Sequence, residues 1–211
     1  PLLVDPSPEL RAAAREHLRG VDLFVEPRKQ WPSGLAAFGP PKGRIAEDER
    51  PLAGRALSVV GDGGWGRLVA SGRGEDEHFA DELVEASAAL IRDRWKPDPA
   101  PTWVACVPSM THPDLVPDFA KRLAAALGLP LHEVVRKVAE NQPQVSMHNS
   151  AQQVRNVWNA FAIDSDGPGG PVLLVDDLAD SKWTLTVIAR ALRLAGSGPV
   201  HPFVLATAIA G

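Results

Sequence analysis

Two adjacent aspartates, Asp176 and Asp177, follow an apolar run and are the residues of this chain best suited to chemistry. Carboxylates in such a position accept hydrogen bonds from sugar hydroxyls or bind a hard cation such as Mg²⁺. The polar loop after them leads into a segment with helical spacing, and the amino end of a helix attracts phosphate groups. The pattern therefore predicts a site for a phosphorylated sugar or a metal ion.

The elements around these acids predict an α/β fold. The run Val172–Val175 is short and β-rich, which suits a strand that is buried on both faces of a parallel sheet and ends at the acids. Leu185, Ile188 and Leu192 recur at helical spacing, and Phe203–Ala208 predicts the next strand. Ligands of open α/β sheets bind beyond the carboxyl ends of the strands, which is where the acids are expected.

Three protein classes place an acidic pair after such a strand. A Walker B strand needs a partner G-x-x-x-x-G-K-[ST] loop, which the sequence does not contain. A response-regulator receiver has its pair near the start of the domain, whereas only a helix and a strand follow here. The segment resembles the third class, the phosphoribosyltransferases, whose fingerprint is four apolar residues, two acids and a hydroxyl-rich loop. Ser181 and Thr184 match two of those hydroxyls.

The resemblance implies a type I phosphoribosyltransferase-like fold. This is an open, mainly parallel sheet flanked by helices, with a smaller N-terminal α+β extension. Residues 1–75 would form that extension, close to a winged-helix element of a larger protein, and residues 76–211 would form the phosphoribosyltransferase-like domain.

The resemblance also assigns roles to individual residues. The acidic pair would hold the ribose hydroxyls of phosphoribosyl pyrophosphate, or of a nucleotide, and contribute to binding Mg²⁺. The implied phosphoribosyl and phosphate site consists of Asp176, Asp177, Asp180, Ser181, Lys182 and Thr184. The implied pyrophosphate loop, after a strand predicted at Trp103–Val107, consists of Ser109, Met110 and Thr111. The implied flap beside the substrate contains Asn149, Gln153, Arg155 and Asn156.

The phosphate loop departs from the family pattern at two positions. Asp180 replaces the first loop threonine, and Lys182 replaces a glycine that lets phosphate approach the backbone. Two like charges about 4 Å apart cost on the order of 4 kcal/mol at an effective dielectric constant near 20. The loop from Pro108 to Asp114 also has no arginine or lysine for pyrophosphate. We therefore expect the transferase chemistry to be weakened or lost.

Several separated motifs resemble the C-terminal region of actinobacterial RecQ-family DNA helicases, which carries a ComF-like phosphoribosyltransferase module. In chain order they are PRKQWPSGLAAFG, KGRI, GRAL, GWG, the polar segment Gln144–Phe161, and DDLADSKWTLT. The resemblance implies an accessory module that binds a nucleotide-like ligand, DNA or a protein partner, joined to the helicase core of the same parent chain. A working magnesium-dependent phosphoribosyltransferase is the alternative. The absence of a first methionine is expected for a piece of a longer protein.

The composition limits the partners. The net charge of -4 and pI near 5.9 disfavour a surface that coats DNA, and no apolar run has transmembrane length, so we expect a cytoplasmic protein without a membrane partner. The N-terminal segment is an exception, because Arg11, Arg15 and Arg19 share one side of a helix predicted between Ser7 and Gly20. That side is either a solvated face or a phosphate contact. Cys106 is the sole cysteine, so an intramolecular disulfide is excluded.

The segment Gly61–Gly66 is a literal G-x-G-x-x-G after an apolar run. A dinucleotide site needs a helix that opens at the third glycine. Because Ser71–Gly74 interrupts the chain soon afterwards, we expect a turn in a connecting region instead. The six histidines lack metal spacing, but His112 and His148 lie near loops that border the expected site.

Overall fold

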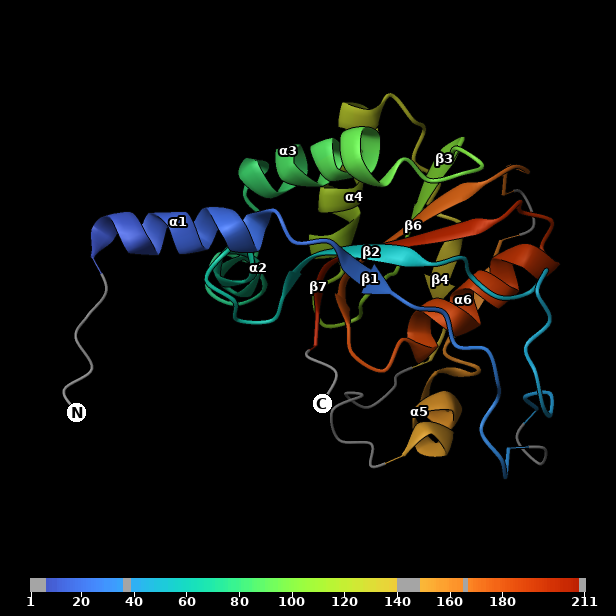
Figure 1. The fold of residues 1–211 in the computed structure, drawn as a ribbon. Helices are drawn as coiled ribbons and strands as arrows, with labels where there is room; N and C mark the ends of the chain where they lie inside the picture. The colour runs from blue at the N-terminus through green and yellow to red at the C-terminus, as the bar shows by residue number, and fades with distance from the viewer. Residues whose placement is uncertain (1–6, 36–38, 140–148, 165–166, 209–211) are drawn as a thin grey trace.

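The computed structural model describes residues 7–35, 39–139, 149–164 and 167–208. A five-stranded sheet with strand order β1-β2-β7-β6-β3 forms its centre (Figure 1). Only the β1-β2 pair is antiparallel, so the prediction of a mainly parallel α/β fold is confirmed. The strands are β1 (Leu23–Val25), β2 (Gly54–Val59), β3 (Trp103–Cys106), β6 (Val172–Ala179) and β7 (Val200–Thr207).

Helices cover both faces of the sheet (Figure 1). One face carries α2 (Gly66–Arg73), α3 (Asp81–Ala89), the π-helical segment η2 (Leu90–Trp95) and α4 (Leu115–Leu127). The other face carries α6 (Trp183–Leu194) and a two-stranded ribbon of β4 (Val135–Lys137) and β5 (Phe161–Ile163). Two further helices lie outside these layers: α5 (Ser150–Val157), which packs with α6, and α1 (Pro8–Arg19), which has no buried residue.

The buried strands show why the apolar run before the acids is continuous. In β6, Leu173 and Val175 pack with the α3-α4 side, whereas Val172 and Leu174 pack with the α6 side. All four side chains are fully buried. A parallel strand covered on both faces needs apolar residues at every position, and truncating one such leucine to alanine costs about 2–5 kcal/mol. The run therefore anchors the acids that follow it.

Residues 1–75 contribute to this same sheet. β2 lies between β1 and β7, and its pairing with β7 runs from Arg55 opposite Phe203 to Val59 opposite Thr207. Leu57 of β2 packs in the cluster that contains α3 and α4. The segment contributes α1, β1, β2 and α2, and the position after residue 75 lies between α2 and α3, which pack on one core.

A cluster of tryptophans joins the segment between β1 and β2 to α6. Trp31 stacks on Trp183, the first residue of α6, with ring centroids 5.7 Å apart. Trp158 meets Trp31 edge-on at 5.2 Å. Leu35 and Ile45 belong to the same buried cluster. The amino end of α6 is therefore supported by a segment about 150 residues earlier in the chain.

The predicted N-terminal helix is confirmed as α1. The Ser7 hydroxyl accepts a hydrogen bond from the Leu10 amide at 3.2 Å, and the helix ends at Gly20. The guanidinium of Arg19 lies 3.7 Å from the ring centroid of Trp65, so this arginine of the predicted basic side packs on the protein. None of the described helices is both long and apolar enough to cross a membrane.

Candidate functional site

The acidic pair lies inside β6, beyond the end of the neighbouring strand β3. β6 extends to Ala179 because β7 continues to pair with it, so the prediction that the strand ends at Val175 was four residues short. β3, in contrast, ends at Cys106 opposite Val175. The chain turns away after Cys106 and leaves Asp176 and Asp177 facing open space. The acids therefore lie just beyond the carboxyl end of β3, although β6 itself continues past them.

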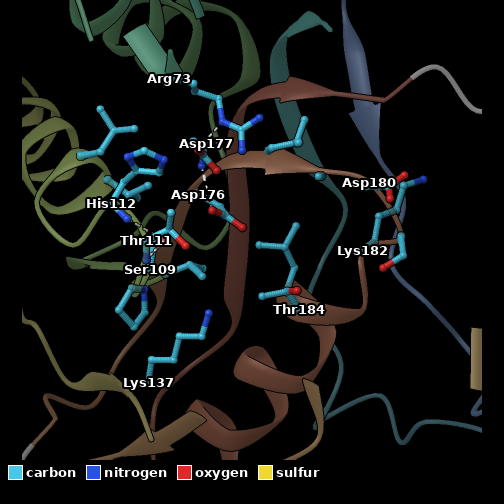
Figure 2. A pocket seen from close by; sticks show the side chains of 18 of the residues that line it. Arg73, Ser109, Thr111, His112, Lys137, Asp176, Asp177, Asp180, Lys182 and Thr184 are labelled. Atoms are coloured by element: carbon cyan, nitrogen blue, oxygen red, sulfur yellow. Dashed lines mark hydrogen bonds and ion pairs between the residues drawn. The ribbon is translucent and has the colours of Figure 1, made fainter. Parts of the chain in front are cut away.

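This open space is a cavity of about 750 Å³, which is within the size range of small-molecule sites. Figure 2 shows Asp176 at its centre, the loop after β3 on one side and the first turn of α6 on the other. Most residues predicted for the phosphoribosyl site and the pyrophosphate loop line it. They are Ser109, Thr111, Asp176, Asp177, Asp180, Ser181, Lys182 and Thr184.

The remaining predicted residues lie elsewhere. Met110 is 52% exposed and does not line the cavity. The four flap residues belong to α5 or cap it, since the Asn149 side chain accepts a hydrogen bond from the Gln152 amide at 3.0 Å. None of the four lines the cavity. The buried side of α5, formed by Val154 and Val157, packs in the tryptophan cluster. Residues 140–148 of the same predicted segment, including His148, lie outside the described part of the chain.

An arginine from α2 neutralises one member of the acidic pair. Nε of Arg73 lies 2.7 Å from Oδ2 of Asp177 (Figure 2). Asp176 is only 7% exposed, and its Oδ1 accepts a hydrogen bond from the Asp177 amide at 2.8 Å. Burial raises the pKa of Asp176 well above its ordinary range, and the adjacent Asp177 charge acts in the same direction. The pair therefore holds much less than two full negative charges for a ligand.

The loop after β3 is stabilised by hydrogen bonds to the side chain of its own Ser109. The Ser109 hydroxyl accepts hydrogen bonds from the amides of Thr111 and His112, each at 3.3 Å. The two amides are thereby turned toward the serine oxygen. His112, expected near the site, lines the cavity, and its Nδ1 lies 3.9 Å from Oε1 of Glu77.

The loop before α6 is fixed by backbone geometry and by Arg28. Lys182 has a left-handed φ of 65°, which turns the chain into α6 at Trp183. Nε and Nη2 of Arg28 donate to the Ser181 carbonyl at 3.0 and 2.8 Å. The first intrahelical bond runs from Thr186 to Lys182 at 3.1 Å, so the amide of Thr184 belongs to the turn that precedes it. These amides and the helix dipole favour an anion at this end of the cavity.

The charges of Asp180 and Lys182 lie to one side of the acidic pair. In Figure 2 both side chains lie away from Asp176 and Asp177. Asp180 is exposed, and both residues line the cavity at its edge. The repulsion expected from Asp180 thus acts at the edge of the cavity, where solvent screens it.

Sequence reasoning missed two of the basic residues that line the cavity, Arg73 and Lys137. Lys137 is the last residue of β4 and extends toward Asp176 and Thr184 (Figure 2). The contact of Arg73 with Asp177 spans 104 residues, and no local spacing signals it. Its position depends on the strand order, which brings β2 and α2 to the same edge as β6.

The prediction of a turn without a helix after the glycine-rich segment was wrong. α2 opens at Gly66, the third glycine of the motif. However, the carboxylate of Asp62 accepts hydrogen bonds from the amides of Val59, Gly64 and Gly66 at 2.8, 2.9 and 2.8 Å. A Cβ atom at Gly66 would collide with the Val59 carbonyl. The protein's own carboxylate therefore fills the place that a dinucleotide pyrophosphate would need.

The acidic pair does not fit a divalent cation held by the protein. Mg²⁺ requires near-octahedral oxygen ligands, but Oδ2 of Asp177 is bound to Arg73 and Asp176 is buried with a raised pKa. Within the described ranges, no group of three or more His, Cys, Asp or Glu residues is arranged to hold a metal ion.

Comparison with known proteins gives structural resemblances alone. No protein-family model and no curated protein matches the sequence. Among solved structures, adenine phosphoribosyltransferase from Leishmania tarentolae has a TM-score of 0.42 at 14% identity, over 87% of this chain and 84% of that chain. The enzyme from Leishmania donovani has a TM-score of 0.42 at 13% identity, over 97% and 82%. The enzyme from Trypanosoma brucei, in complex with AMP, pyrophosphate and ribose-5-phosphate, has a TM-score of 0.39 at 14% identity, over 98% and 82%.

Proposed function

We propose that this chain is a phosphoribosyltransferase-like module that binds a phosphorylated ribose, free or as part of a nucleotide, with little or no transferase activity. One observation carries the proposal: a cavity of about 750 Å³ combines the acidic pair of β6 with the amino end of α6. Carboxylates accept hydrogen bonds from a ribose diol, and helix amides donate hydrogen bonds to a phosphate. The spacing of these two features along the β6-α6 unit suits one sugar phosphate.

The remaining polar groups of the cavity have places in this arrangement. Asp177 is the more accessible acid, with 16% of its side chain exposed, and would accept from a ribose hydroxyl. The hydroxyl and amide of Thr184 would contact the 5′-phosphate. Lys137 would contribute a positive charge on the side of the loop after β3.

Reduced transferase chemistry follows from the charge balance. Transfer from phosphoribosyl pyrophosphate develops negative charge on the departing pyrophosphate, which donors must stabilise. Two amides of the loop after β3 already donate to Ser109. The loop between Pro108 and Asp114 has no arginine or lysine. These features favour binding over group transfer.

A working phosphoribosyltransferase that uses phosphoribosyl pyrophosphate and magnesium is the second candidate. It is supported by Lys137, because this residue supplies a cation that the loop between Pro108 and Asp114 lacks. The measurement that separates the two candidates is pyrophosphate release from phosphoribosyl pyrophosphate in the presence of a panel of purine and pyrimidine bases. Release that is lost with Asp177→Asn would establish the second candidate.

The wider setting proposed is the C-terminal region of a RecQ-family DNA helicase, where this module would be an accessory to the motor. The ordered motifs of the sequence support this setting, and DNA would then be a partner of the parent protein. Arg11 and Arg15 of α1 are the candidate phosphate contacts. A DNA-binding titration over a salt series, with and without Arg11→Gln and Arg15→Gln, tests this part: a salt slope that the variants leave unchanged would refute the contact.

The binding proposal is tested by calorimetry with ribose 5-phosphate. We expect saturable binding to the wild-type chain and at least about a tenfold loss for Asp177→Asn, which corresponds to one lost charge-assisted hydrogen bond. Asp114→Asn is the matched control, because Asp114 is exposed and does not line the cavity. Absence of binding to the folded wild-type chain, or equal binding to Asp177→Asn, would refute the proposed function.

A further inference from the structure

We propose that Arg73 acts as the built-in counter-ion of this site, so that its acidic pair excludes divalent cations and takes the sugar phosphate without a metal. The proposal deepens the proposed function, because it concerns the same cavity and names what that cavity rejects. It rests on the ion pair between Arg73 and Asp177 and on the way the fold holds α2.

The ion pair sits where a metal would need to bind. Nε of Arg73 is 2.7 Å from Oδ2 of Asp177, and both side chains line the cavity. The other acid, Asp176, has one carboxylate oxygen on the Asp177 amide. A cation at the pair would meet a guanidinium already bound to one of its two carboxylates. Because the guanidinium already occupies Oδ2 of Asp177, a divalent ion that uses this oxygen as a ligand has to displace Arg73.

Arg73 is held in this place from both ends of α2. At the amino end, the carboxylate of Asp62 binds three main-chain amides around the start of the helix. At the carboxyl end, Gly72 packs so closely that a Cβ atom there would lie 2.8 Å from the His78 carbonyl oxygen and 2.7 Å from the ring of Phe79, which is fully buried. The Gly74 amide closes the helix on the carbonyls of Ala70 and Ser71.

This anchoring distinguishes Arg73 from a surface arginine that reaches an acid by chance. Gly72, the residue before it, is packed against the core, so the backbone keeps the Arg73 side chain within reach of Asp177. Only Nε of the guanidinium contacts Asp177, and Arg73 lines the cavity, where a planar donor suits a phosphoryl or hydroxyl oxygen of the ligand. Arg73 therefore replaces the charge that a cation would provide.

The test measures metal binding without any sugar, so that it is independent of the ribose 5-phosphate titration. Mn²⁺, used as a paramagnetic probe for Mg²⁺ sites, is titrated into the wild-type chain, Arg73→Gln, and the double variant Arg73→Gln with Asp177→Asn. We expect weak binding to wild type, at least about a tenfold gain in affinity for Arg73→Gln, and loss of that gain in the double variant. Arg67→Gln is the control, since Arg67 is exposed on α2 and does not line the cavity.

Two results would overturn the inference. One is micromolar Mn²⁺ binding to the wild-type chain that Asp177→Asn abolishes, because the pair would then accept a divalent ion beside Arg73. This result needs no Arg73 variant, so it stands even if that variant fails to fold. The other is equal Mn²⁺ affinity of wild type and a folded Arg73→Gln. Ribose 5-phosphate binding tests the proposed function separately. The affinity for ribose 5-phosphate is expected to be the same in the presence of a chelator as in the presence of Mg²⁺.

Discussion

Replacing Arg28 with alanine tests whether the segment between β1 and β2 holds the loop before α6. Arg28 makes two hydrogen bonds to the Ser181 carbonyl, and its guanidinium lies 5.1 Å from the ring centroid of Trp183. The net contribution of a hydrogen bond is about 0.5–1.5 kcal/mol, and the partly exposed ring contact adds about 0.5 kcal/mol. Burial of the guanidinium lowers its pKa and opposes this gain. We expect Arg28→Ala to lower the free energy of unfolding by about 2 kcal/mol.

The assay is urea denaturation combined with a thermal melt. A loss of about 2 kcal/mol corresponds to a fall in Tm of roughly 4–8 °C for a chain of this size. Lys29→Ala is the control, because Lys29 is the exposed neighbour and should change the unfolding free energy by less than about 0.5 kcal/mol. Arg28→Lys keeps the charge but not the two-pronged donor, so it should recover only part of the loss. A folded Arg28→Ala that is as stable as Lys29→Ala would refute the reasoning.

Three further predictions concern groups away from the cavity. Burial lowers the pKa of His201 below its ordinary value of 6.5, so the unfolded chain binds the proton more readily. The stability that this histidine contributes is therefore complete above pH 6.5 and falls as the pH drops. In urea titrations, the free energy of unfolding of His201→Gln should depend less steeply on pH than that of the wild-type chain. An unchanged slope would count against this. Asp62→Ala removes three hydrogen bonds to amides and should cost about 2 kcal/mol in urea denaturation, against no more than about 0.5 kcal/mol for the exposed Asp48→Ala. Burial raises the pKa of the Cys106 thiol to about 12, so iodoacetamide should modify it only in denaturant, and rapid labelling of the native chain would contradict its burial.

The β6-α6 unit was predictable because its signals are local. The apolar run of β6 and the helical spacing of α6 are readable over about 20 residues, and the structure places both elements within a few residues of the prediction. The error at the end of β6 has a non-local cause: pairing with β7 continues past Val175 to Ala179. Strand length here depends on a neighbour whose alignment the β6 sequence does not encode.

The opposite wall of the cavity was not predictable in this way. Arg73 and Lys137 lie 104 and 40 residues before Asp177 in the chain, and neither belongs to a recognisable motif. They reach the acids because α2 follows a strand that pairs with β7, and because β4 forms a ribbon with β5 next to α6. Both arrangements depend on tertiary contacts between segments that are far apart in the chain. The sequence analysis considered only the charges of the two loops that follow β3 and β6. It therefore underestimated the positive charge in the cavity.

The glycine-rich motif shows how the same local geometry can serve a different end. A helix that opens at the third glycine presents amides to an anion, and in this chain that anion is the carboxylate of Asp62. Because the amides are satisfied internally, the motif binds no external phosphate and instead fixes the start of α2. An anchored α2 then delivers Arg73 to Asp177. The motif thus contributes to the site indirectly, by setting the charge of the acidic pair on which the ligand would bind.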